Sequence, residues 1–142
     1  MVPVVVLQQI KAPVDRVFNF IANLETHPQI ASFCQSVKYT SERRQGVGAT
    51  FHQFYKNGGE CDSEIIVWEP PTKIVWQNFY GAAKKPGQTV TYYLEQEGEI
   101  THVLHTVERT DDREGDVDLA HHREGTAENV EEMANLKKIL ES

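Results

Sequence analysis

Cysteine is scarce in this chain, which contains only Cys34 and Cys61 among its 142 residues. Two cysteines cannot build a disulfide framework, and these two lack the close spacing of a zinc or redox pair. We therefore expect both thiols to be reduced and to fill space as small apolar side chains. Long apolar runs are also missing, because no stretch approaches the roughly 20 residues that a helix needs to cross a bilayer.

Basic charge is in short supply. The chain has 14 lysines and arginines against 21 acidic residues, which gives a net charge of -7. This balance supplies no phosphate-binding footprint, so neither nucleic acid nor an anionic membrane surface is an expected partner. The apolar start, Met1–Ile10, is short and has neither the basic segment nor the cleavage site of a signal peptide. We expect a cytoplasmic protein that makes no integral membrane contact.

Motifs that hold phosphates, esters or metals are absent as well. Gly46 and Gly48 precede an expected strand rather than a helix, which does not favour a nucleotide site. No Gly-x-Ser-x-Gly elbow occurs. His102 and His105 are three residues apart on one expected strand, so they point to opposite faces and cannot share a metal ion. We expect no metal and no cofactor.

Apolar residues, in contrast, form 39% of the chain, and they are regularly spaced. The β-branched run Val2–Lys11 predicts a first strand. Pro13 suits the first turn of a helix, in which apolar residues recur at spacings of three and four from Val14 to Ile21. His27-Pro28 is expected to end this helix, and a short second helix is expected to run through Ile30 and Phe33.

The middle of the chain alternates strand-like segments with turn signals. The turns are short, and Asn57-Gly58-Gly59 is a strong hairpin signal, so the strands are expected to pair as an antiparallel meander. The loop Gly81–Gly87 is expected between two of them. The expected strands are Val37–Glu42, Ala49–Lys56, Glu60–Glu69, Lys73–Tyr80, Gln88–Gln96 and Ile100–Thr110.

The final segment predicts a long helix after a charged loop at Asp111–Asp116. Gly125 weakens the first half of this helix, so we expect it to begin near Thr126, a reasonable N-cap. Its acidic residues are expected to form a solvated outer face. Its expected apolar positions are Leu119, Thr126, Val130, Met133, Leu136 and Leu140.

Together these elements predict one α+β domain spanning residues 1–142. A sheet of seven antiparallel strands cannot stay flat, so it should curl. The C-terminal helix is the only long element able to cover the concave face.

Five stretches of the chain carry a resemblance to a known superfamily. They lie at an opening strand-to-helix junction, a helix-to-helix turn, a hairpin, a Pro-Pro turn and a closing helix. Their residues are Ile10–Phe18, Asn23–Pro28, Gly46–Phe51, Trp68–Ile74 and Leu136–Glu141. In these the chain resembles the START-like, or SRPBCC, superfamily, which includes polyketide cyclases, the birch-pollen-allergen fold and lipid-transfer domains.

The resemblance implies a helix-grip fold with an internal cavity between the sheet and the long helix. Relatives bind lipids, hormones, polyketides or quinones there, and a minority do chemistry. The superfamily shares no catalytic triad, so no catalytic residue is carried over. The polar segment Asp111–Gly125 departs from the more apolar helix start of many relatives.

Strand alternation indicates which side chains face the concave side of the sheet. In Cys61–Glu69, charged Asp62 and Glu64 should face water, which places Cys61, Ser63, Ile65 and Val67 inside. Buried amides such as Gln53 and Asn78 need partners or a wet cavity. The residues expected to line the cavity are Phe51, Gln53, Tyr55, Ser63, Trp76, Asn78, Tyr92, His105 and Met133.

These observations favour a binding or carrier module for a small hydrophobic or amphipathic molecule. A cyclase- or dehydratase-type enzyme is the first alternative, in which His105, Tyr92 or Tyr55 would shuttle a proton. A protein–protein interaction module using the same groove is the second. Whether the chain forms a homodimer is left open.

Overall fold

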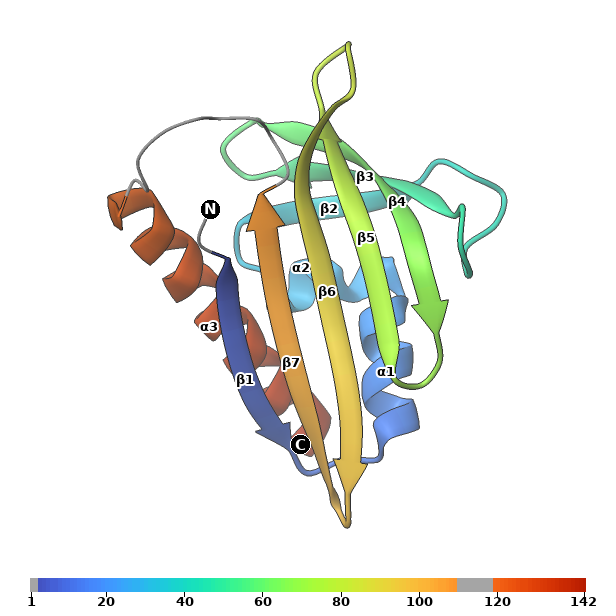
Figure 1. Cartoon of the computed structure of the whole chain (residues 1–142), viewed down its shortest axis with the longest axis vertical. Coiled ribbons are helices and arrows are strands. Elements are labelled where there is room, and N and C mark those ends of the chain that lie inside the picture. Colours follow the sequence, from blue (N-terminus) through green and yellow to red (C-terminus); the bar gives the residue numbers. More distant parts are fainter. Residues whose placement is uncertain (1–2, 110–118) are drawn as a thin grey trace.

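The computed structural model describes residues 3–109 and 119–142, and its elements follow the expected order (Figure 1). A strand is followed by short helices, six further strands and a long helix. In chain order they are β1 (Val4–Ile10), α1 (Val14–Ala22), the 3-10 helix η1 (Leu24–Thr26), α2 (His27–Ile30), β2 (Cys34–Tyr39), β3 (Thr50–Tyr55), β4 (Glu60–Glu69), β5 (Lys73–Tyr80), β6 (Lys85–Glu97), β7 (Ile100–Arg109) and α3 (Leu119–Glu141).

The seven strands form one antiparallel sheet in the order β1-β7-β6-β5-β4-β3-β2. Six of them follow each other as a meander, and β1 joins at the edge beside β7. The sheet curls strongly, so that β2 and β3 run across the direction of β5, β6 and β7 (Figure 1). This arrangement confirms the predicted α+β helix-grip fold with its curved sheet and long C-terminal helix.

Helix α1 begins directly after Pro13 and buries Val17, Phe18 and Ile21 on one face, as their spacing predicts. The prediction around His27-Pro28 is wrong in detail. The helix already ends at Ala22, and Pro28 lies in the first turn of α2. A proline is accepted there because the first helical N–H groups have no intrahelical partner. Phe33 lies outside α2, which ends at Ile30.

Two strands depart from their expected bounds. β2 begins earlier, at Cys34, and a bulge between Cys34 and Ser36 adjusts its pairing with β3. β6 begins at Lys85 rather than Gln88, because the turn after β5 is tighter than the expected loop Gly81–Gly87. Gly81 and Lys84 both adopt positive φ in that turn.

A β-bulge in β4 corrects one face assignment. The register shifts between Ile65 and Val67, so that Val67 pairs with Val75 on the convex face. Val67 was expected inside, and this prediction is wrong because an extra residue inverts the alternation that follows it. Trp68 takes the inner position instead, and its ring meets Phe18 edge-on at 5.4 Å between centroids.

Helix α3 is longer than predicted. It begins at Leu119 and includes Gly125, so the expected start near Thr126 is wrong. The packing of α3 against β1 outweighs the weak helix propensity of glycine. A Cβ at Gly125 would lie 3.9 Å from Val4 Cγ2, an ordinary contact distance, so the position does not itself require glycine. Thr126 caps nothing and donates its hydroxyl to the His122 carbonyl at 2.8 Å. The expected loop Asp111–Asp116 lies outside the described residues.

The buried face of α3 differs from the predicted apolar stripe. Leu119 and Val130 are exposed, whereas Met133, Leu136 and Leu140 are buried. The acidic face is not wholly solvated either, because Glu132 is buried under the helix. No helix within the described ranges has both the length and the apolarity that a membrane span requires.

Candidate functional site

A row of aromatic side chains crosses the concave face of the sheet. It runs from Phe51 on β3 through Trp76 on β5 and Tyr92 on β6 to His105 on β7. The ring centroids lie 5.6, 5.4 and 4.2 Å apart in that order, and Tyr92 and His105 are stacked. All four side chains are buried. The site is therefore built from rigid strands rather than from loops.

Helix α3 adds two polar side chains to the end of this row. The Tyr92 hydroxyl donates to Glu132 Oε2 at 2.7 Å, and His105 Nε2 lies 3.2 Å from the same oxygen. His105 Nε2 also lies 2.9 Å from Asn129 Oδ1. All four residues are buried. We call Tyr92, His105, Asn129 and Glu132 the helix-side cluster.

Hydrogen-bond partners hold the ring of His105 in place. Its Nδ1 faces the Thr91 carbonyl at 3.1 Å, which can only accept, so this nitrogen is the donor. The Asn129 amide nitrogen donates to the Gly125 carbonyl at 2.7 Å, which turns Oδ1 toward His105 Nε2. Nε2 is thus flanked by two oxygens, Asn129 Oδ1 and Glu132 Oε2, in a fully buried site.

Tyr92 is held in one protonation state by the helix-side cluster. Burial, together with the Glu132 charge, raises the pKa of Tyr92 well above its ordinary value, so its hydroxyl stays protonated. Tyr92 can therefore donate a hydrogen bond but cannot act as a base at neutral pH. The cluster places an imidazole, a phenol, an amide and a carboxyl group within hydrogen-bond reach of one another.

His27 on α2 contacts the aromatic row from the side opposite the sheet. Its ring meets the Trp76 indole edge-on, with centroids 5.7 Å apart. Burial lowers the pKa of His27 below the ordinary histidine value, although the nearby Glu132 charge acts in the opposite direction. The ring is therefore neutral at pH 7. The Trp76 Nε1–H group is buried and has no hydrogen-bond partner within the described ranges.

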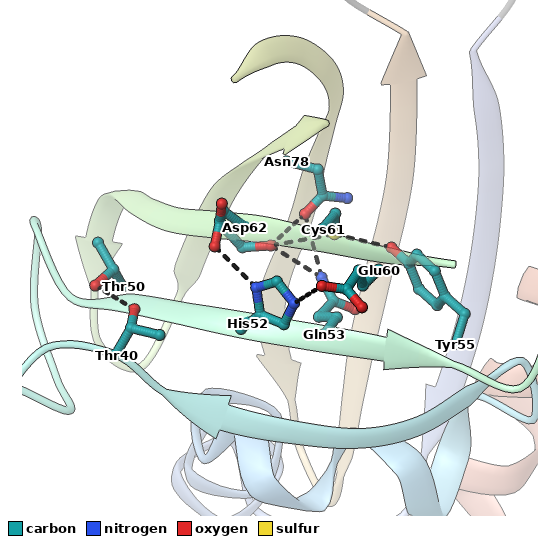
Figure 2. A network of polar contacts seen from close by, with 10 residues as sticks. Thr40, Thr50, His52, Gln53, Tyr55, Glu60, Cys61, Asp62 and Asn78 are labelled. Carbon is teal, nitrogen blue, oxygen red and sulfur yellow. Dashed lines mark hydrogen bonds and ion pairs between the residues drawn. The ribbon is translucent and has the colours of Figure 1, made fainter. Parts of the chain in front are cut away.

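A second polar group occupies the other end of the concave face, where the sheet curls most (Figure 2). Gln53 Nε2 donates to Ser63 Oγ at 3.0 Å and to Asn78 Oδ1 at 3.2 Å, and Ser63 donates to Asn78 Oδ1 at 2.6 Å. Asn78 Nδ2 in turn donates to Gln88 at 3.3 Å. We call these four residues the strand-side cluster. Its two buried amides are satisfied largely by each other.

Tyrosines extend the strand-side cluster toward β3. The Tyr80 hydroxyl donates to Gln88 Oε1 at 2.5 Å, and it lies 3.5 Å from the Tyr55 hydroxyl. The Tyr55 hydroxyl lies 3.0 Å from Cys61 Sγ. Burial is the first cause of the raised pKa of both tyrosines, so both hydroxyls remain protonated at neutral pH.

Both cysteines are free and buried, as the sequence predicts. Burial raises the pKa of the Cys34 thiol to about 11 from a reference value of 9.0. We expect native Cys34 to react with iodoacetamide at pH 8 roughly 100-fold more slowly than an ordinary thiol, since only the thiolate is nucleophilic. Peptide mapping after timed labelling measures this rate, which should rise as the pH approaches 11. Equally fast labelling of native and urea-unfolded protein at pH 8 would contradict the expectation.

His52 illustrates what lies outside the site. It is adjacent to Gln53 on β3 and so points to the convex face, where Asp62 and Glu60 flank it at 2.8 and 3.1 Å (Figure 2). All three side chains are partly exposed, and each carboxylate contacts one ring nitrogen of His52. Among the residues that the structure describes, no group of three or more His, Cys, Asp or Glu side chains has a metal-binding arrangement.

An open pocket of about 400 Å³ lies elsewhere, beside α2 and the end of α3. None of its lining residues belongs to either polar cluster. They are Gln29, Asn135, Lys138, Ile139 and Ser142. The pocket is therefore separate from the concave-face site.

The structure divides the sequence-predicted site residues between two neighbourhoods. Trp76, Tyr92 and His105 lie in or beside the helix-side cluster, with Met133 on the buried face of α3. Gln53, Ser63 and Asn78 form the strand-side cluster, which Tyr55 approaches through Tyr80. Phe51 begins the aromatic row.

Sequence reasoning missed His27, Tyr80, Gln88, Asn129 and Glu132. The sequence did carry a signal for two of them. Asn129 lies four residues before Met133, and Glu132 lies four residues before Leu136, so both share the helix face of these apolar residues. Strand alternation could also have found Tyr80 and Gln88, because each lies two residues from a residue expected inside, Asn78 and Val90 respectively.

The curled sheet, the covering helix and the two short N-terminal helices define a START-like, or SRPBCC, protein. More specifically, the family model described as "Activator of Hsp90 ATPase homolog 1-like protein" matches residues 11–141, so the chain belongs to that family. A comparison with curated proteins gives no match.

Solved structures agree with this assignment at the level of the fold. The Aha1 dimer from Colwellia psychrerythraea is 20% identical, with a TM-score of 0.73 over 99% of this chain and 97% of that one. A protein from Nitrosospira multiformis is 19% identical, with a TM-score of 0.74 over 99% and 97%. The di-domain ARO/CYC StfQ from the steffimycin biosynthetic pathway is 17% identical, with a TM-score of 0.71 over 96% of this chain and 44% of that one.

Proposed function

We propose that this protein is a single-domain binding module that holds a small, mostly apolar molecule between the concave face of the sheet and α3. The observation that carries the proposal is the composition of that face. Apolar and aromatic walls surround two separate polar clusters, which are buried except for the half-buried Gln88. Small-molecule sites combine apolar walls with a few fixed polar groups in this way.

Stability alone gives no reason for this composition. A buried contact between ionisable side chains, such as His105 with Glu132, is often no more stabilising than well-packed apolar residues of the same volume, and it is frequently less so. Buried amides add little net stability even when they are satisfied. Polar groups in the place where a core would normally be apolar therefore support a recognition role.

Native mass spectrometry of the purified full chain tests the proposal. We expect a species heavier than the chain by the mass of a small molecule, which organic extraction removes and which can then be identified. Addition of a medium-chain apolar probe to extracted protein should restore a bound species and raise the unfolding temperature. A bare chain mass before extraction, together with no response to any apolar probe, would contradict the proposal.

An enzyme of the cyclase or dehydratase type is the second candidate, and the fold shared with the ARO/CYC StfQ favours it. Proton transfer needs a group that can change its protonation state near the substrate. Burial holds Tyr92 and Tyr55 protonated at neutral pH, so neither phenol can act as a base. Both ring nitrogens of His105 already face partners within the protein, the Thr91 carbonyl and Asn129, which favours binding over proton transfer to a substrate.

A homodimer is a further element of the proposal. The related Colwellia protein is described as a dimer. In this chain the convex face exposes apolar side chains on the edge strand β1, where Leu7 is 76% exposed and Val5 is 52% exposed. Exposed apolar patches commonly mark interfaces between protein chains. The same native mass spectra distinguish monomer from dimer directly.

A further inference from the structure

One buried polar group of the site has no hydrogen bond within the described residues. The Trp76 side chain is 1% exposed, and its Nε1–H donor has no partner. His27, which is 7% exposed, lies beside it: its ring contacts those of Trp76 and Phe33 and senses the Glu132 charge. Buried donors are almost always satisfied, so an unsatisfied one calls for an explanation. Both groups border the same part of the concave face, because their rings are 5.7 Å apart.

The charges near Trp76 restrict what could accept its N–H group. No lysine or arginine is buried in the parts of the chain that the structure describes. The two buried histidines supply no free cation either, because burial lowers the pKa of His27, and because His105 Nε2 already lies 3.2 Å from Glu132 Oε2. A ligand carboxylate or phosphate would therefore have no free counter-ion, and it would meet the like charge of Glu132. A neutral acceptor faces neither penalty.

We infer that the bound molecule carries a neutral carbonyl oxygen, which accepts a hydrogen bond from Trp76 Nε1 while the apolar remainder packs along the aromatic row. This inference rests on the proposed function, and it narrows the ligand class to neutral ketones, esters or amides with an apolar body. The inference excludes fatty acids and phospholipid-type anions from the ligand class. His27, on the other side of the indole, would complete the polar end of the site.

Three probes of equal length test the inference: 2-decanone, decane and decanoate at pH 8. The chain has two tryptophans, so its indole N–H signals in a proton–nitrogen correlation spectrum number two, and Trp68 is the internal control. We expect 2-decanone to move the Trp76 signal downfield and to leave the Trp68 signal nearly unchanged. Decane should bind without the downfield shift, and decanoate should bind at least about tenfold more weakly than 2-decanone.

Trp76→Phe removes the donor and keeps an aromatic ring. It should weaken 2-decanone binding about fivefold and leave decane binding unchanged, whereas the matched Trp68→Phe variant should change neither. If Trp76→Phe does not fold, the indole shift of the native chain still decides the matter. Decanoate binding as tightly as 2-decanone, or no shift at Trp76, overturns the inference but leaves the proposed function standing. Failure of all three probes to bind overturns both.

Discussion

Replacing Glu132 with glutamine is expected to destabilise the protein by about 1–3 kcal/mol, because one buried carboxyl oxygen serves two other buried groups. Glu132 Oε2 accepts from the Tyr92 hydroxyl at 2.7 Å and lies 3.2 Å from His105 Nε2. An amide keeps one oxygen for these groups but brings an N–H group into the same closed site, where the described residues arrange no free acceptor for it. The Asn129 amide cannot turn to help, because it is held by the Gly125 carbonyl. Urea unfolding followed by circular dichroism measures the change.

The neighbouring Glu131 supplies a matched control. It stands one residue earlier on the same helix and is exposed, so Glu131→Gln should change the free energy of unfolding by less than about 0.5 kcal/mol. A double variant sharpens the test. If the contact between the two side chains is the cause, His105→Leu combined with Glu132→Leu should cost far less than the sum of the two single changes. Equal stability of Glu132→Gln and the native chain would show that the contacts of Glu132 with Tyr92 and His105 do not stabilise the fold.

Sequence reasoning succeeded where the alternation of side chains along a strand matches their burial in the folded protein. Alternation along β3 and β7 placed Gln53 and His105 on the concave face because neither strand has a bulge near these residues. It failed at Val67, where one extra residue inverts the alternation. Helix propensity gave the wrong start for α3 because the packing of the whole helix against β1, a long-range contact, outweighs the local preference of Gly125 for another conformation.

The pairing of His105 with Glu132 is harder to foresee for a related reason. The two residues are 27 positions apart, and they meet only because α3 packs across the concave face. Because α3 contains many acidic residues, Glu132 is expected to face solvent unless the buried face of the helix is already known. Asn129 is hidden in the same way, although both residues continue the face defined by Met133 and Leu136. Polar residues on an apolar stripe are therefore the signal that single-sequence reading should pursue.

Leucine-to-alanine changes on α3 separate the buried stripe from residues that merely share its spacing. Leu136 is 0% exposed, so Leu136→Ala removes buried contacts and leaves a cavity, which should cost about 2–5 kcal/mol. Leu119 has the same chemistry and was assigned to the same apolar pattern, yet it is 68% exposed. Leu119→Ala should therefore change the free energy of unfolding by less than about 0.5 kcal/mol.

The comparison also tests whether α3 holds the concave face closed. Thermal unfolding of the two variants at equal concentration gives the difference directly, and the apolar probe binding described above gives its consequence. Because α3 carries Glu132 and Asn129 into the site, a loosened helix in Leu136→Ala should weaken probe binding, whereas Leu119→Ala should bind like the native chain. Equal losses of stability in the two variants would show that burial along α3 is not distributed as the structure has it, and the helix-side cluster would lose its structural basis.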